Sequence, residues 1–200
     1  GHSEKVFFMR IFFSILVLIF NLQSWTMADN IKDFELEKLS VGDSLLKFMT
    51  KKQIEKSDLK YYPSNSKFYT VAYNGNLQNY DAIELMLKRN DKNFEIYMIR
   101  GGIFVKNLKE CNTLRDNIVR EVKSKFLNPI YQSGKQEHYL YPNSFQYISQ
   151  FMFKDSANKY DNIRVSCYIF DEDIKKIHNF GDNLSVIVQS GIAGEWIENR

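Results

Sequence analysis

The residue types that could do chemistry are few in this chain and widely spaced. After residue 28 there are two histidines, His138 and His178, and neither stands in an HxH, HxxxH or HExxH spacing that would place two imidazoles on one metal ion. The acidic cluster Asp171, Glu172 and Asp173 directly follows a predicted strand, where ligand-binding loops commonly lie. It lacks the spaced carboxylates and the turn glycine of an EF-hand loop. We therefore treat these five residues as candidate ligand-binding residues, predict no metal and no cofactor, and assign no catalytic residue.

Nucleophile motifs are also incomplete. The block from Gly42 to Leu45 resembles the Gly-Asp-Ser-Leu block of some esterases, but no Asp-x-x-His pair follows it, so Ser44 is interpreted as part of a helix start. Gly101-Gly102 lacks the glycine spacing of a phosphate-binding loop. A hydrolase whose residues converge only in the fold stays open as an alternative, with Ser44, the two histidines and the acidic cluster as its material. Four aromatic residues crowd one region and could either line an apolar pocket or belong to the sheet core: Tyr139, Tyr141, Phe145 and Tyr147.

Two cysteines are expected to form a disulfide. Cys111 falls on the apolar face of a predicted helix, and Cys167 falls on the inward side of a predicted strand, so both point into one core. An even pair of cysteines in an exported protein is typical of a disulfide, because the compartment outside the cytoplasmic membrane is oxidising. Two separate buried thiols are the alternative. A catalytic cysteine would need an electropositive, partly exposed setting.

The N-terminal region predicts export. Arg10 is followed by an apolar run that ends at Phe20, and the small-residue site ending at Ala28 then precedes Asp29, in the order that a secretory signal peptide requires. We expect the natural start at Met9 and divide the chain into residues 1–28, which hold the signal peptide, and one globular domain over 29–200. The alternative, an uncleaved membrane anchor, would need about 20 apolar residues, and the apolar run that ends at Phe20 is shorter than that. The predicted location is therefore periplasmic or secreted, with membrane contact only through the signal segment if it stays uncleaved.

Composition limits the classes of partner. The chain has 27 basic and 24 acidic residues, a formal net charge of +3, which gives no field strong enough to indicate a nucleic-acid partner or a polybasic membrane contact. An aromatic content of 15% argues against disorder, because such a chain has apolar area to bury. The expected partner is an unknown small ligand or an envelope protein.

Hydrophobic periodicity predicts the elements that must position these residues. Strands are predicted at 34–37, 68–73, 83–88, 94–98, 145–154, 163–170 and 184–189, with Gly101-Gly102 as a bulge or sharp bend. Helices are predicted at 43–49, after the capping pair Thr50 and Gln53, from Asn107 to residue 126, and behind Ser190. Residues 132–136 and 171–183 are interpreted as connections. Strands that run in groups favour an α+β fold: an antiparallel sheet of about six to seven strands with one long helix packed on it and short helices near both ends.

Three segments resemble a group of uncharacterised small secreted proteins of marine bacterioplankton: Ser40 to Leu46, Glu110-Cys111 and Glu195 to Ile197. No activity is assigned to that group, so the resemblance implies export and a shared fold and transfers no site residue. The function expected from the sequence is thus a non-catalytic, exported module that binds a ligand or an envelope partner, with the hydrolase as the alternative.

Overall fold

The computed structural model describes residues 30–155 and 157–200, so the predicted signal segment lies outside the described residues. Its centre is an antiparallel sheet with the strand order β1-β2-β3-β7-β6-β5-β4. The α+β class and the antiparallel sheet predicted from the sequence are therefore confirmed. The strands are β1 Phe68–Ala72, β2 Ala82–Lys88, β3 Ile96–Phe104, β4 Ile130–Glu137, β5 Phe145–Lys154, β6 Tyr160–Ile169 and β7 Asn183–Gln189.

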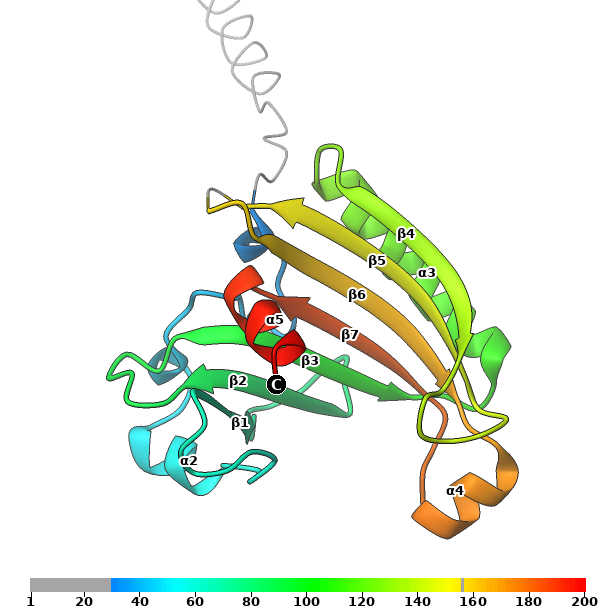
Figure 1. Cartoon of the computed structure of the whole chain (residues 1–200), viewed down its shortest axis with the longest axis horizontal. Helices are drawn as coiled ribbons and strands as arrows, with labels where there is room; N and C mark the ends of the chain where they lie inside the picture. Colours follow the sequence, from blue (N-terminus) through cyan, green and yellow to red (C-terminus); the bar gives the residue numbers. More distant parts are fainter. Residues whose placement is uncertain (1–29, 156) are drawn as a thin grey trace, which may run out of the picture.

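The helices lie on both faces of this sheet and at one of its ends (Figure 1). α3 lies behind the sheet and α5 in front of it, while α4 extends beyond the ends of β6 and β7. Within the described part of the chain, no helix is long and apolar enough to span a membrane. The helices are α2 Lys51–Lys56, α3 Leu108–Lys125, α4 Glu172–His178 and α5 Gly191–Glu198, preceded by the short 3-10 turns η1 Ile31–Asp33 and η2 Leu45–Lys47.

Local sequence signals explain where α3 begins and which side of it is buried. The Asn107 side chain accepts a hydrogen bond from the backbone N–H of Glu110, which satisfies one of the free donors at the helix start. Cys111, Val119 and Val122 are its buried residues and face the sheet core. The predicted disulfide is confirmed: the sulfur atoms of Cys111 and Cys167 are 2.10 Å apart and join α3 to β6.

The two faces of the sheet bury different amounts of apolar surface. On the α3 face, alternate residues of the central strands form the main core, including Ile99, Val165 and Val186. On the opposite face α5 covers only one end, where Met98 and Phe68 pack with Ala193. The rest of that face, toward α4, carries no helix.

The N-terminal predictions were wrong in two places. Residues 34–37 form no strand; instead Leu36 and Leu39 form an isolated bridge around Glu37, which has a positive φ of 53°. Residues 43–49 hold only the 3-10 turn η2, because backbone hydrogen bonds tie this segment to β3 and to the turn before it, including Ile96 N–H to the carbonyl of Asp43. The capping box of Thr50 and Gln53 that begins α2 is confirmed.

Three further predictions were wrong. Residues 132–136 belong to strand β4 rather than to a connection, and residues 172–178 form helix α4 rather than a loop. β3 continues through Gly101 and Gly102 without a break, and the register shift against β2 lies earlier in β3, at Tyr97, opposite Met86 and Leu87. Gly101 is explained by packing, because a Cβ there would lie 2.6 Å from the Tyr80 ring.

Candidate functional site

The open face of the sheet displays one short pattern twice. β3 carries Arg100, Gly102 and Phe104 at alternate positions, and β6 carries Arg164, Ser166 and Tyr168, so each strand presents arginine, a small residue and an aromatic residue on one face. Both strands are antiparallel to β7, which lies between them. The register therefore aligns the two arginines across Ile187, the two small residues across Ser185, and the two aromatic residues across Asn183.

This alignment creates a groove, here called the sheet groove, made of two adjoining hollows. The first has a volume of about 370 Å³ and the second about 330 Å³. Arg100, His138 and Tyr168 line both hollows, so the two are continuous. The first hollow is lined in addition by Gln136, Tyr139, Gln146, Arg164 and Ile187, and the second by Phe104, Tyr141, Phe170, Asn179, Phe180, Gly181 and Asn183.

A row of mostly small residues crosses the strands between the arginine row and the aromatic row. Register places Gly102, Ser185, Ser166, Ile148 and Gly134 side by side in this row. A Cβ added at Gly102 or Gly134 would find no atom within 4 Å, so the space above both glycines is open. The hydroxyls of Ser166 and Ser185 are buried and have no hydrogen-bond partner among the described residues.

The charge of the first hollow is positive. No carboxylate lines it, and among residues 30–155 and 157–200 the Arg164 guanidinium forms no ion pair. Arg100 is 3.7 Å from the carboxylate of Glu84, a pair whose arginine side chain is 46% exposed. Burial lowers the pKa of His138 below its ordinary value, and its Nδ1 accepts a hydrogen bond from the Leu140 N–H, so its ring is neutral at pH 7.

His138 is the only one of the five candidate ligand-binding residues that lines this groove. His178 is exposed at the end of α4 and stacks against Phe180, and Tyr141 lies between the two histidines, 4.8 Å from one ring and 5.3 Å from the other. Of the four aromatic residues that crowd this region, Tyr139 and Tyr141 line hollows, whereas Tyr147 packs against the main core on the α3 face.

The acidic cluster Asp171, Glu172 and Asp173 forms the N-terminal end of helix α4. The Asp171 side chain accepts a hydrogen bond from the backbone N–H of Asp173 at 2.9 Å, as an N-cap does. Glu172 pairs with Lys175, and Lys175 also reaches the buried carboxylate of Asp182 at 2.9 Å. Burial opposes the charge of Lys175, but its hydrogen bonds to the two carboxylates outweigh this effect and raise its pKa. These contacts fix α4 at one end of the groove.

The candidate hydrolase residues do not converge in the described part of the chain. The Ser44 hydroxyl donates a hydrogen bond to the backbone carbonyl of Asn93, just before β3 begins. Both histidines are far from Ser44 and from Asn93 in the sequence. Within residues 30–155 and 157–200, neither His138 nor His178 forms a side-chain hydrogen bond to a hydroxyl or carboxylate, and no group of three metal-ligating side chains is close enough to hold an ion.

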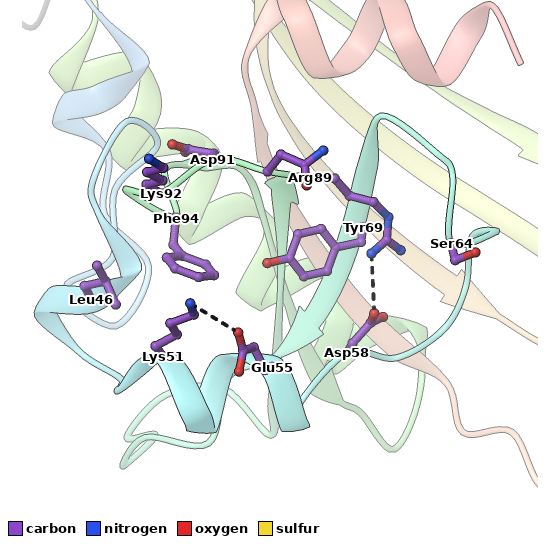
Figure 2. A pocket seen from close by; sticks show the side chains of 11 residues that line it. Leu46, Lys51, Glu55, Asp58, Ser64, Tyr69, Arg89, Asp91, Lys92 and Phe94 are labelled. Carbon is purple, nitrogen blue, oxygen red and sulfur yellow. Dashed lines mark ion pairs between the residues drawn. The ribbon is translucent and has the colours of Figure 1, made fainter.

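A larger hollow of about 850 Å³, the α2 cleft, lies between α2 and the turn that joins β2 to β3. Figure 2 shows that charged side chains come from both sides of this cleft, with one ion pair along α2 and one between Arg89 and Asp58. Lys51 lies 3.7 Å from Glu55, and Arg89 lies 3.8 Å from Asp58 while its guanidinium stacks on the Tyr69 ring. Much of the charge lining this cleft is thus compensated within the protein.

Two residues that line the α2 cleft, Asp58 and Tyr69, have shifted pKa values. Burial disfavours the charge of Asp58, but hydrogen bonds from Lys60 and the charge of Arg89 outweigh that effect and hold its pKa below the ordinary value. Burial raises the pKa of Tyr69 to about 12, so its hydroxyl stays protonated at physiological pH. The α2 cleft therefore offers a neutral hydroxyl and mostly paired charges, with the Arg89 Nε buried and without a partner among the described residues, whereas the sheet groove offers the unpaired guanidinium of Arg164.

Sequence reasoning found His138, Tyr139 and Tyr141 but missed the two arginines of the groove, Arg100 and Arg164. Their signal was present in the outward positions of β3 and β6, where arginine, a small residue and an aromatic residue recur at intervals of two. Comparison of the chain with protein-family models, with curated proteins and with solved structures finds no match.

Proposed function

We propose that this protein is a non-catalytic module of the cell envelope, periplasmic or secreted, that binds a small ligand in the sheet groove. The two hollows have volumes of the size usual for small-molecule pockets. The first hollow is lined mainly by polar and charged side chains and the second mainly by aromatic ones, so the groove joins groups that can orient a ligand to apolar surface that can bury it.

One observation supports this proposal most strongly. Arg100 and Arg164, from the two strands that flank β7, line the same hollow, and no carboxylate is among the residues that line it. A guanidinium group presents several N–H donors and has no acceptor, so two of them at one hollow need acceptors from outside the lining. This arrangement is better suited to a polar ligand than to stability alone.

The disulfide supports the location. Cys111 and Cys167 are both fully buried and bonded to each other, and structural disulfides persist in oxidising compartments outside the cytoplasm. Together with the signal sequence expected at residues 9–28, this supports export. No observation favours the hydrolase alternative, because the residues that it would need remain apart.

A thermal-shift screen of the full chain tests the proposal. A library of neutral, cationic and anionic small molecules should contain compounds that raise the melting temperature, because binding to the native state stabilises it by mass action. The same compounds are then tested on Gly102→Val, whose new side chain enters the open space of the groove.

The matched control is Ser133→Val, which places the same side chain on the other face of strand β4, beside Gly134. The stabilising compounds should lose their effect on Gly102→Val and keep it on Ser133→Val. If every stabilising compound acts equally on Gly102→Val and on the unsubstituted chain, the groove is not the binding site and the proposal is wrong.

A further inference from the structure

The two arginines of the sheet groove point to the charge of its ligand. Arg100 and Arg164 stand two strands apart, about 9 to 10 Å between backbones, and flank Ile187. Both line the first hollow, so their guanidinium groups reach one space. Guanidinium presents N–H donors in a planar fork that matches carboxylate oxygens, and such charge-assisted hydrogen bonds are about twice as strong as neutral ones.

One of these two arginines, Arg164, has no acidic partner among the described residues. Within the described residues only Glu84 approaches either arginine, and it lies beside Arg100 on β2, on the side away from β7. The polar residues nearest to Arg164 in the lining are glutamines, Gln136 and Gln146, which carry no charge. An anion placed between the arginines would therefore meet no opposing carboxylate in that hollow.

The second hollow supplies flat apolar surface next to the arginines. Its aromatic side chains form one connected cluster with ring centroids 4.8 to 6.3 Å apart: His138, Tyr141, Tyr168, Phe170 and Phe180. Phe104 borders it and is 67% exposed, which is high for a phenylalanine. Aromatic rings of this kind pack against a planar ligand by offset or edge-to-face contacts.

We propose that the sheet groove binds a small organic anion with an aromatic body, whose carboxylate lies between Arg100 and Arg164 and whose ring packs against Tyr168 and its aromatic neighbours. This inference rests on the proposed function, since it names the ligand class for the same groove. Ser166 and Ser185 lie between these two ends by register, but their hydroxyls are buried and line neither hollow, so the arginines and the aromatic rings make the contacts to the ligand.

Calorimetric titration of the full chain with three probes tests each part of this assignment. Cinnamate carries a carboxylate and an aromatic ring, cinnamyl alcohol carries the ring without the charge, and acetate carries the carboxylate without the ring. Cinnamate should have a Kd at least about tenfold lower than the Kd of cinnamyl alcohol or of acetate. Equal binding of cinnamate and cinnamyl alcohol would overturn the anionic class.

Two variants separate the charge from the site. Arg164→Gln keeps the length and polarity of the side chain without its charge, and it should weaken cinnamate about tenfold while leaving cinnamyl alcohol unchanged. The matched control is Arg120→Gln, an exposed arginine on α3 that bonds only to Asn117 of its own helix. It should leave all three affinities unchanged.

The outcomes distinguish a wrong ligand class from a wrong site. If Gly102→Val abolishes binding of both ring-containing probes but Arg164→Gln changes neither, the groove is a binding site and the anionic assignment is wrong. If cinnamate binds equally to the unsubstituted chain and to Gly102→Val, both the assignment and the proposed site are wrong. Absence of cinnamate binding to the unsubstituted chain overturns the assignment, and the thermal-shift screen then decides the site by itself.

Discussion

Ser166 and Ser185 differ from another buried serine in that their hydroxyls have no hydrogen-bond partner among the described residues. A third buried serine, Ser144, has a hydroxyl that accepts a hydrogen bond from the backbone N–H of Asp171 at 3.0 Å and helps to hold the start of α4. The hydroxyls of Ser166 and Ser185 form no hydrogen bond with any of the described residues. The same side chain is thus satisfied beside α4 and unsatisfied within the sheet.

Alanine at these positions should therefore have opposite effects. Ser166→Ala and Ser185→Ala remove an unsatisfied buried hydroxyl and should raise the free energy of unfolding by up to about 1 kcal/mol in the absence of ligand. Ser144→Ala leaves the Asp171 N–H without a partner and should lower it by about 1 to 3 kcal/mol. Urea denaturation measures all three, and a loss at Ser166 or Ser185 as large as that at Ser144 would contradict the account.

His138 should make stability depend on pH. Burial lowers the pKa of the folded imidazole below 6.5, so the unfolded chain binds more protons than the folded chain once the pH falls toward 6.5 and below. The free energy of unfolding should therefore decrease as pH falls from 7 through this range, until the folded imidazole also titrates. His138→Gln should flatten this part of the profile. Identical slopes for the variant and the unsubstituted chain between pH 7 and 5 would show that His138 carries no such linkage.

At the scale of elements, α3 could be predicted because its signals are local. The cap at Asn107 and an apolar residue every three or four positions suffice to define it. β4 could not be predicted, because its residues are all exposed and show no alternation. It forms a strand because the edge of β5 supplies hydrogen-bond partners along its whole length, from Ile130 to Glu137. That partner is not visible in β4's own sequence.

The sheet groove could not be predicted from the sequence for a related reason. Its arginines come from strands that are distant in the chain and become neighbours only through the register of β3, β7 and β6. Periodicity identifies which residues of a strand share a face, but it does not say which strands lie side by side. The aromatic residues near His138 were found from the sequence because they are close together in the chain.

Burial within α3 leads to a graded prediction. Val122 is fully buried against the sheet, whereas Ile118, one turn earlier, is only partly buried. Val122→Ala should lower the free energy of unfolding by about 2 kcal/mol through lost transfer energy and an unfilled cavity. Arg120→Ala, on the exposed side of the same helix, should change it by no more than about 0.5 kcal/mol. Chemical denaturation that finds equal effects at both positions would mean that α3 does not contribute to the core.

For the whole molecule, the disulfide links the helical layer to the sheet across 56 residues of sequence. Closing a loop of that length restricts the unfolded chain and should contribute about 4 kcal/mol to stability in the chain-entropy model. The double variant Cys111→Ala with Cys167→Ala should unfold at a correspondingly lower urea concentration than the oxidised protein. A loss below about 1 kcal/mol would mean that the folded layers hold together without the covalent link.

The central claim is that the open face of the sheet, and not the larger α2 cleft, is where this protein binds its ligand. The most direct measurement is an amide proton–nitrogen NMR titration of the full chain with cinnamate. Glycine amide signals are well separated in such spectra, and glycines lie both beside the groove and away from it. Gly102 lies between Arg100 and Phe104 on the groove face of β3, whereas Gly42 and Gly75 are not among the residues near the groove lining. The account predicts that cinnamate shifts the signals of Gly102, Ser166 and Ser185 in a saturable manner and leaves those of Gly42 and Gly75 in place. Saturable shifts confined to residues of the α2 cleft, such as Tyr69 and Arg89, would contradict it.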